Sequence, residues 1–373
     1  MDTKSLQRDV AAILARADIH INGSNPWDLQ IHNQQFYKRV ITQGTLGLGE
    51  SYMDGWWDCE QIDEFVCRAL RADLYKVARL TWRGWLEALL AKVMNHQVKG
   101  KAARNAQIHY DIGNKLYQLM LDKRMAYSCG YWKNANNLDQ AQENKLDLIC
   151  RKIYLQPGQR VLDIGCGWGS FAKFAAERYG AEVVGITVAH EQVKLARELC
   201  QGLPVEIRLQ DYRDVQGQFD HVVSVGMAEH VGYRNYRTYM QTAARCLKPD
   251  GLFLLHTMGM AYSRTSADPF TNKYLFPNSL LPSLKQLGGA MENIFVLEDL
   301  HNFGAHYDYT LLAMFRNFDQ NWELLQPEYG DLFYRLWKYY LLSTAGSFRA
   351  RNNQLWQIVL SKKGLMGGYE SVR

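Results

Sequence analysis

The sequence lacks the features that mark disulfide-linked, metal-binding and membrane-spanning proteins. Its seven cysteines are scattered and odd in number, and no two are spaced as Cys-x-x-Cys, which argues against a disulfide framework or a zinc site and favours a reducing cytosol. No apolar run approaches the length that spans a bilayer, and the N-terminus has no apolar core of a signal peptide. We therefore expect a cytoplasmic protein without a bound metal, which would meet a membrane only from the surface.

The chain also has little excess charge, but that charge is unevenly distributed. A net charge of +5 over 373 residues is far below that of a dedicated nucleic-acid binder, so we expect no nucleic-acid partner, and 47% hydrophobic residues predict a folded core. Residues 66–104, however, carry nine Lys and Arg against two acids, with Leu, Val and two Trp residues at three- and four-residue steps. This pattern is typical of a helix on a membrane surface, and equally of a helix packed on a core with a solvated basic face.

A glycine-rich run, Gly44-Thr-Leu-Gly-Leu-Gly-Glu50, follows a predicted short helix at 5–17 and a predicted short strand at 27–31. The run lacks the Gly-Lys-Ser/Thr ending that supplies the cation and the metal ligand of a phosphate-binding loop. We therefore interpret it as a turn followed by a helix.

From about residue 158 the chain alternates between strand-like and helix-like segments. The expected strands are 160–165, 182–187, 205–210, 221–226, 252–257 (after a turn at 248–251) and 355–360, and the expected helices are 170–179, 191–201 and 236–247. Strands that alternate with helices pair in parallel, and apolar runs such as VVSV and LFLL suit strands buried on both faces. The pattern predicts an α/β fold with a Rossmann-like sheet.

The first strand of this region ends in a glycine loop, Asp163-Ile-Gly165-Cys-Gly167-Trp-Gly169, and a helix follows. Glycines at such a position let the backbone approach a ligand, to which the next helix presents its N-terminus. A dinucleotide fingerprint needs a further glycine at position 170, where this chain has Ser170. The spacing therefore favours S-adenosylmethionine as the cofactor.

The next two strands supply the other candidate cofactor contacts. The second strand ends at Thr187 without the acid that commonly binds ribose hydroxyls, so we expect Gln192 to make that polar contact. The third strand ends at Gln210, and after it Asp211 and Tyr212 are candidates to bind the adenine by hydrogen bonding and stacking. A helix or turn cap is the alternative role for Asp211.

Several further motifs carry a specific resemblance, in the right order over nearly the whole chain. They are Tyr127-Ser-Cys-Gly-Tyr-Trp132, Met227-Ala-Glu-His-Val-Gly232, His301-Asn-Phe-Gly-Ala-His-Tyr307 and Phe348-Arg-Ala-Arg351. With the glycine loop, they make the sequence resemble cyclopropane-fatty-acyl-phospholipid synthases, the family that includes the mycolic acid cyclopropane synthases. The resemblance implies a class I S-adenosylmethionine-dependent methyltransferase sheet with a smaller N-terminal α+β lipid-interacting domain. We place that domain at 1–95, a linker at 96–110 and the catalytic domain at 111–373.

The resemblance also implies an activity, in which a methylene group passes from S-adenosylmethionine to the cis double bond of unsaturated acyl chains in membrane phospholipids. Methyl transfer leaves a carbocation, from which a bound bicarbonate ion takes a proton so that the cyclopropane ring closes. By resemblance, the groups around the bicarbonate are Cys129, Glu229, His256, Tyr307 and the backbone of Met258. Tyr127 and Ser128 are then expected at the methionine end of the cofactor, and His230 at its adenine. A homodimer, peripheral on the inner face of the membrane, is also implied.

Each of these residues has a simpler interpretation as well. Cys129 is a candidate buried structural thiol, Glu229 a helix start and His256 a core histidine with its hydrogen bonds satisfied. For the whole chain the alternatives are a methyltransferase of a small amine, an enzyme that quenches the cation with water, and a non-catalytic lipid-surface protein. The basic segment 66–104 favours lipid over amine, and Glu229 favours ring closure over hydration.

Overall fold

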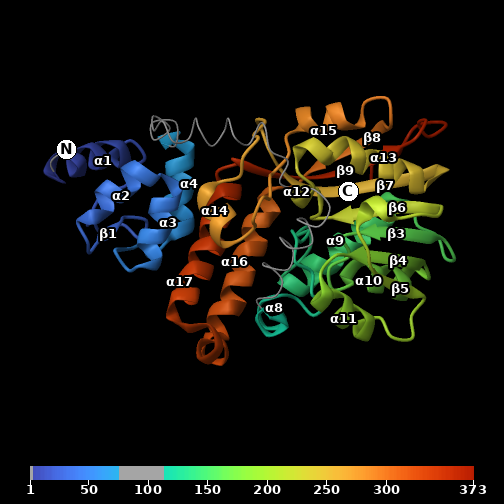
Figure 1. Ribbon diagram of the computed structural model, residues 1–373, viewed down its shortest axis with the longest axis horizontal. Helices are drawn as coiled ribbons and strands as arrows, with labels where there is room; N and C mark the ends of the chain where they lie inside the picture. The colour runs from blue at the N-terminus through green and yellow to red at the C-terminus, as the bar shows by residue number, and fades with distance from the viewer. Residues whose placement is uncertain (1–2, 75–112) are drawn as a thin grey trace.

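The structure, a computed structural model, describes residues 3–74 and 113–373 (Figure 1). The predicted domain boundaries at residues 95 and 110 lie outside the described residues, as does most of the basic segment 66–104. Of that segment, the structure describes the end of α4 (Ile62–Arg71) and the residues up to Leu74.

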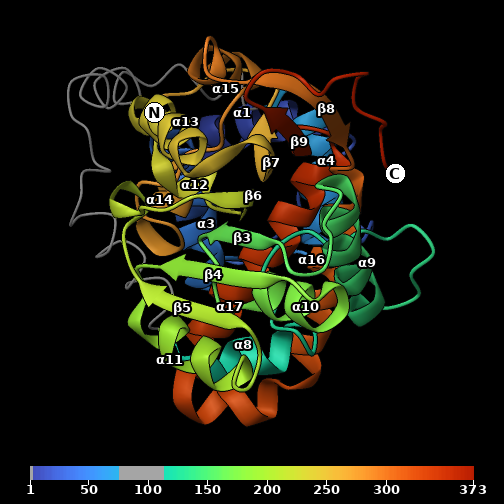
Figure 2. The ribbon, with the colours of Figure 1, turned by 90° about the vertical axis from the view of Figure 1, so that its right-hand side faces the viewer.

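A seven-stranded sheet forms the larger part of the molecule, with strand order β5-β4-β3-β6-β7-β9-β8 (Figure 2). The strands are β3 (Arg160–Ile164), β4 (Glu182–Thr187), β5 (Val205–Leu209), β6 (Phe219–Val225), β7 (Leu247–Met260), β8 (Val296–Asn302) and β9 (Asn353–Ser361). The pairs from β5 to β7 are parallel, whereas β9 runs antiparallel to both β7 and β8. The predicted α/β fold is confirmed, as is parallel pairing of the strands that alternate with helices; β9 and β8 add an antiparallel edge.

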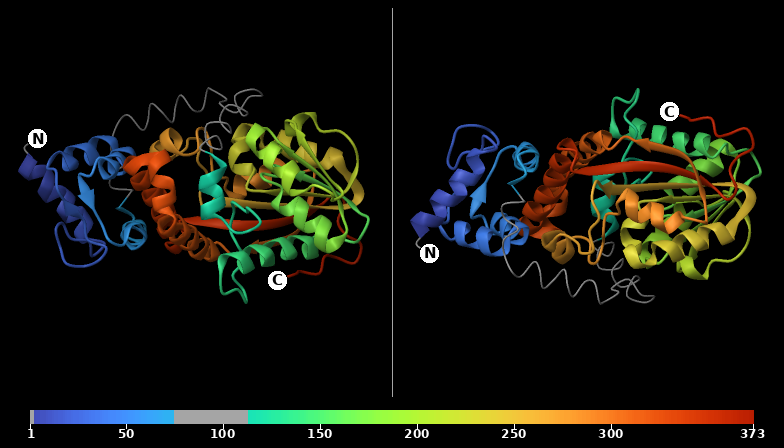
Figure 3. Two further views of the ribbon diagram at one scale, coloured as in Figure 1. Left: turned by 90° about the horizontal axis from the view of Figure 1, so that it is seen from below. Right: turned by 90° about the horizontal axis from the view of Figure 1, so that it is seen from above.

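Helices cover both faces of the sheet (Figures 2 and 3). On one face α9 (Leu138–Lys152), α10 (Ser170–Tyr179) and α11 (His190–Leu199) pack against Val161, Val183 and Ile207. On the other face α13 (Tyr236–Cys246) and α15 (Leu284–Met291) pack against Leu162 and Val184. Because neighbouring residues of each strand point to opposite faces, these strands are apolar along their length.

The turn expected at residues 248–251 is an irregularity within β7. Phe219 of β6 pairs with Leu247, and His221 pairs with Leu252, so four residues of β7 lie opposite the single residue of β6 between these pairs. The chain therefore continues in the same strand after the extra residues. The observed β7 is longer than the predicted strand at both ends.

The N-terminal residues form a small unit of helices and one two-stranded ribbon. It contains α1 (Thr3–Ala15), α2 (Gln35–Gln43), α3 (Thr45–Met53), α4, β1 (Gln30–Ile31) and β2 (Trp57–Asp58). The glycine-rich run lies in α3, which confirms a turn followed by a helix. A side chain at Gly49 would overlap the ring of Phe270, so this glycine permits close packing against α14 (Pro269–Tyr274).

Two long helices, α16 (Ala305–Gln320) and α17 (Trp322–Arg349), lie between this unit and the sheet (Figures 1 and 3). A side chain at Gly346 of α17 would overlap the carbonyl oxygen of Asp63, so α4 and α17 are in close contact. Arg349 forms ion pairs with Asp63 and Glu64 of α4 and with Asp308 of α16. One continuous hydrophobic core therefore extends from α1 to α17. None of the described helices combines the length and the apolar character that crossing a bilayer requires.

Candidate cofactor and catalytic site

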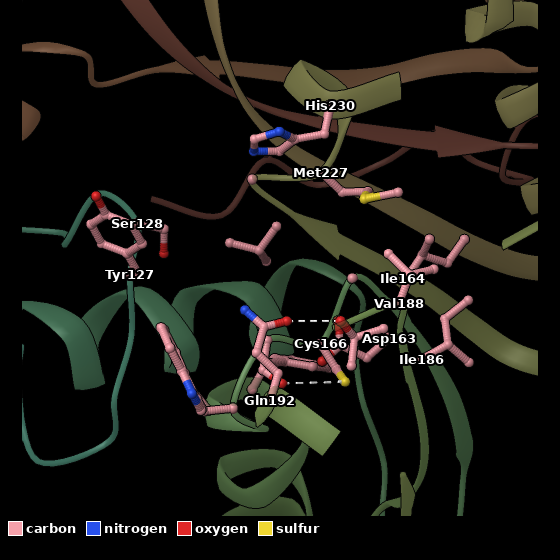
Figure 4. Close-up of a pocket in the computed structure, with 18 of the residues that line it drawn as sticks. Tyr127, Ser128, Asp163, Ile164, Cys166, Ile186, Val188, Gln192, Met227 and His230 are labelled. Carbon is pink, nitrogen blue, oxygen red and sulfur yellow. Dashed lines mark hydrogen bonds between the residues drawn. The ribbon is translucent and has the colours of Figure 1, made fainter. Parts of the chain in front are cut away.

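A pocket opens at the carboxyl ends of β3, β4 and β6, the edge at which open α/β sheets bind ligands. The glycine loop forms its floor between β3 and α10. Gly165 has a φ of 82°, and a side chain there would lie 3.1 Å from Met227, so the loop conformation and the close approach both require glycine. In Figure 4, Tyr127 and Ser128 lie on one side of the pocket, and Ile164, Ile186 and Val188 lie on the other.

This pocket brings together every residue that the sequence analysis assigned to the cofactor. They are Tyr127, Ser128, Asp163, Gly165, Gly167, Thr187, Gln192, Gln210, Asp211, Tyr212 and His230. They come from five separate segments of the chain, which the fold places around one cavity. Their contacts with a ligand remain predictions.

Gln192, in the first turn of α11, is the residue predicted to replace the acid that the end of β4 lacks. The Thr187 hydroxyl donates a hydrogen bond of 2.7 Å to Gln192 Oε1. This bond fixes the orientation of the amide and leaves its N–H groups to donate. Gln192 is 4% exposed and lines the pocket, so a neutral polar group occupies the predicted ribose position.

Of the three residues predicted to bind the adenine, Asp211 and Tyr212 have partners within the protein, and His230 is a neutral imidazole. Asp211 caps the short helix η1 (Tyr212–Asp214) by accepting a hydrogen bond of 3.0 Å from the N–H of Arg213, which confirms the cap role. The ring of Tyr212 is buried with its edge against Tyr239. Burial lowers the pKa of His230 to about 4, so its imidazole is neutral at physiological pH.

A second group of polar atoms lies where α12 (Ala228–Val231) meets β7. Glu229 Oε1 accepts a hydrogen bond of 2.6 Å from the N–H of Met258, and Oε2 has no partner among the described residues. Burial raises the pKa of Glu229 to about 7. The carbonyl of Met258 accepts a hydrogen bond from Thr257. Glu229 does stand in a helix, as the simpler interpretation expected, but one of its oxygens is buried and unsatisfied.

His256 lies on the same strand as Met258, two residues earlier, and therefore on the same face of the sheet. Its Nδ1 lies 3.3 Å from Gln357 Nε2 on β9. Its Nε2 is buried without a partner among the described residues, and burial holds the pKa of the ring well below its usual value. The interpretation of His256 as a fully satisfied core histidine is therefore wrong.

Cys129 belongs to a loop that is fastened to α16. Gly130 N–H and Trp132 Nε1–H both donate to Thr310 Oγ1, at 3.0 and 2.9 Å. The Cys129 thiol is fully buried, and burial raises its pKa, so it stays protonated at neutral pH. Tyr307, in the first turn of α16, packs its ring on Phe348 with the centroids 4.6 Å apart.

Phe303 lies between these two groups. Its ring centroid is 5.2 Å from that of Tyr131, in the Cys129 loop, and 5.9 Å from that of His256. The structure therefore joins Glu229 to Met258 and places His256 two residues earlier on the same strand. The Cys129 loop and the start of α16 pack against Phe303, which also contacts His256. That all of them contact one anion remains a prediction.

Three further aromatic residues have packing or hydrogen-bond partners within the protein. Tyr131 packs on Phe303, the indole of Trp132 bonds to Thr310, and the Tyr274 hydroxyl donates 2.8 Å to Glu50 in the N-terminal unit.

Sequence reasoning missed Tyr340 and Phe276, which contact the pocket residues Tyr127 and His230, respectively. The hydroxyls of Tyr127 and Tyr340 lie 2.8 Å apart, and the Phe276 ring lies 5.8 Å from both Tyr340 and His230. No local pattern marked them, because their partners lie far away in the sequence; Tyr127 and Tyr340 are 213 positions apart.

Sequence reasoning also missed Lys145, which lines the pocket from α9. The sequence did contain an indication that this side chain is buried. The buried face of α9 repeats at helical spacing through Gln142, Lys145, Ile149 and Lys152. In residues 3–74 and 113–373, no three His, Cys, Asp or Glu side chains gather as metal ligands.

Comparison with known proteins shows which family has this arrangement. Residues 97–358 match the family model for mycolic acid cyclopropane synthetase. The chain is 50% identical over 361 residues to the cyclopropane-fatty-acyl-phospholipid synthase of Escherichia coli, covering 97% of this chain and 94% of that protein. This chain belongs to the cyclopropane synthetase family. A probable fatty acid methyltransferase of Pseudomonas putida is 38% identical over 268 residues, or 68% of each chain.

Solved structures of the family share the fold. Mycolic acid cyclopropane synthase CmaA1, complexed with SAH and CTAB, superposes with a TM-score of 0.66 at 28% identity, over 70% of this chain and 98% of that one. The cyclopropane synthase MmaA2 of Mycobacterium tuberculosis gives the same TM-score and coverage at 26% identity. Coclaurine N-methyltransferase has a TM-score of 0.70 at 20% identity, which shows a common fold and no more. The predicted class I methyltransferase fold is thereby confirmed.

Proposed function

We propose that this protein transfers a methylene group from S-adenosylmethionine to the cis double bond of unsaturated acyl chains in membrane phospholipids. The observation that carries the proposal is 50% identity over nearly the whole chain to a cyclopropane-fatty-acyl-phospholipid synthase. The pocket supports it, because all the candidate cofactor residues line one cavity and unsatisfied polar atoms lie beside it.

The first step needs position more than an enzyme base. An alkene is a weak nucleophile without a proton to lose, so the protein must hold the cofactor methyl group in line with the double bond. The new carbon–carbon bond leaves a carbocation on the acyl chain. The rings of Tyr127, which lines the pocket, and of Tyr340 and Phe276, which pack beside it, are our candidates to stabilise this positive charge.

The second step removes one proton from the transferred methyl group, whose electrons then close the ring. We assign a bicarbonate ion to this step, because the buried atoms beside the pocket match it. Glu229 Oε2 accepts a hydrogen bond when ionised, and His256 Nε2 donates one when it carries the ring proton. When bound, bicarbonate supplies a base that the sulfonium does not consume.

The chain's own residues then have distinct tasks. Met258 holds Glu229 in place through its N–H. Glu229 would then orient a bound bicarbonate by accepting a hydrogen bond from its hydroxyl. His256, Tyr307 and Cys129 would donate hydrogen bonds to its remaining oxygens. The buried, protonated thiol of Cys129 is suited to donating and not to attack.

We further propose that the protein works as a homodimer on the cytoplasmic, inner face of the membrane. The composition of residues 66–104 supports docking, since anionic headgroups attract a strongly basic segment with tryptophans. We propose that residues 1–95 form the lipid-interacting domain and that a linker at 96–110 joins it to the catalytic domain at 111–373.

Incubation with radiolabelled S-adenosylmethionine tests the proposal. With vesicles of a phospholipid that carries a cis-monounsaturated chain, label should enter the lipid as its alkene disappears. Vesicles of the saturated phospholipid are the control and should stay unlabelled. If a soluble amine is labelled and the lipid is not, the protein is an amine methyltransferase and the proposal is wrong.

A further inference from the structure

Lys145 places a buried ammonium group in the wall of the cofactor pocket. The residue is 1% exposed, and its Nζ lies 3.1 Å from Ser128 Oγ. Among the described residues no carboxylate lies within 4.0 Å of this nitrogen, the limit for an ion pair. Removing an ammonium group from water costs several kcal/mol unless an anion compensates it. The position of Lys145 therefore calls for an anionic partner.

Lys152, two turns further along α9, is a buried lysine with a purely structural role. It is also fully buried, but its Nζ lies 3.2 Å from Asp299 Oδ2, and it is not part of the pocket wall. One helix thus carries two buried lysines, of which one has its carboxylate within the chain. The other faces the cavity where the cofactor is expected.

The carboxylates nearest Lys145 do not neutralise it directly. Asp122 accepts hydrogen bonds from the backbone N–H groups of Ala126 and Arg124. Asp163, at the end of β3, lines the same pocket, and its Oδ2 has no partner among the described residues. The pocket therefore holds one buried cation and one buried carboxylate that are not paired with each other at ion-pair distance. A zwitterionic ligand would supply a carboxylate to the buried cation and an ammonium group to the buried carboxylate.

We propose that Lys145 and the Ser128 hydroxyl bind the α-carboxylate of the cofactor's methionine portion, while Asp163 binds its α-ammonium. Ser128 Oγ accepts from Lys145, which leaves its own O–H to donate to the carboxylate. The inference rests on the proposed function, because the amino-acid portion belongs to S-adenosylmethionine. It adds a binding residue and a charge pattern that the sequence motifs do not contain.

The chief alternative is that Lys145 only fastens the loop that carries Ser128. That task is already performed by Gln142, one turn earlier on α9. Its Nε2 donates to the carbonyl oxygens of Ser128 and Ala126, at 2.8 and 3.2 Å. Gln142 therefore provides a matched control for loosening the loop without removing a charge. Burial lowers the pKa of Lys145 to about 8, so the ammonium is mostly charged at neutral pH.

Calorimetric binding of two nucleosides to the full-length chain tests the inference. S-adenosylhomocysteine has the carboxylate and the ammonium, and 5′-methylthioadenosine has neither. Lys145→Met should raise the Kd of S-adenosylhomocysteine by about 100-fold and that of 5′-methylthioadenosine by less than about 3-fold. Lys145→Arg, which keeps the charge, should recover part of the loss. Gln142→Met should change both constants by a similar factor.

Equal changes for both ligands in Lys145→Met, or no change for either, would overturn the inference. If Lys145→Met does not fold, the wild-type chain supplies the test with decarboxylated S-adenosylmethionine, which should bind about 100-fold more weakly than S-adenosylmethionine. Equal affinity there would also overturn it. A chain that shows the expected binding pattern and labels no lipid would instead contradict the proposed function alone.

Discussion

Glu229 places a carboxyl group inside the protein, with one oxygen bonded to Met258 N–H and the other without a partner among the described residues. In the proposed mechanism its negative charge orients the base. Glu229→Gln should therefore lower kcat by about 10²- to 10⁴-fold. The Kd of S-adenosylhomocysteine should stay within a few-fold, because Glu229 is not in the wall of the cofactor pocket.

The control for this variant is Glu182→Gln, at the exposed start of β4. It removes the same charge far from the ends of the strands where the site lies, and it should leave kcat unchanged. Turnover of Glu229→Gln at the wild-type rate would remove Glu229 from the base site.

The pH dependence of kcat follows from the same residue. Burial raises the pKa of Glu229 to about 7, so the carboxylate is protonated below that pH and loses the negative charge that orients the base. At saturating cofactor and excess bicarbonate, kcat should fall about tenfold per pH unit below 7 and reach a plateau above it. Burial also raises the pKa of Asp163 to about 7, and its titration should appear in the KM for the cofactor. A flat kcat from pH 5.5 to 8 would contradict the assignment.

At the residue scale, the sequence identified groups that stand in motifs and missed those that do not. Asp163, Gly165 and Gly167 follow a strand and precede a helix, a context with a known physical meaning. Lys145 and Tyr340 lie inside ordinary helices, where a polar or aromatic side chain has many possible reasons to be present. Their role depends on which cavity the helix faces, and that is a property of the tertiary structure.

Thr310 shows how one element positions another. Its hydroxyl accepts hydrogen bonds from Gly130 N–H and Trp132 Nε1–H and donates to the carbonyl of His306. Thr310→Val leaves two buried donors unsatisfied, so we expect a loss of about 1–3 kcal/mol in the free energy of unfolding. Because the Cys129 loop then shifts, kcat should fall about tenfold with little change in cofactor Kd.

Chemical denaturation and steady-state kinetics check this prediction. Thr42→Val is the control, because the Thr42 hydroxyl donates to backbone carbonyls on an exposed part of α2 in the N-terminal unit. If Thr310→Val lowers stability and leaves kcat unchanged, the contact with α16 supports the fold alone.

At the scale of elements, the parallel strands were predictable and the antiparallel edge was not. The strands β3, β4 and β6 are apolar because helices cover both of their faces. β8 lies at the edge, exposes Val296 and Leu297, and contains charged residues, so it has no continuous apolar signal. β9 was predicted as a strand, but its direction depends on the long helix α17 that precedes it.

For the whole molecule, the N-terminal unit and the sheet are joined through α17. The ion pairs of Arg349 link α4 to α16, whose first turn carries Tyr307. The two parts of the chain, the N-terminal unit and the sheet, were predicted from the composition and from the family resemblance. The sequence did not indicate this shared core, because the contacting residues are nearly 300 positions apart.

The proposed membrane contact through residues 66–104 is testable by charge removal. Replacing Arg83, Lys92, Lys99 and Lys101 together by Gln should weaken co-sedimentation with anionic vesicles by at least about 100-fold, since each basic group near the surface contributes about 1 kcal/mol. The matched control replaces four exposed basic residues elsewhere, Lys133, Arg178, Lys194 and Lys363. Equal weakening by both sets would indicate a general charge effect and contradict a docking role for the segment.

The central claim is that a transferred methyl group loses one proton to a base and closes a ring on the acyl chain. The most direct measurement uses S-adenosylmethionine with a fully deuterated methyl group, cis-monounsaturated phospholipid vesicles and mass spectrometry of the released acyl chains. The account predicts a product that retains two of the three deuterium atoms, has lost its alkene and carries no added oxygen. A product that retains all three, or that contains a hydroxyl group from water, would contradict it.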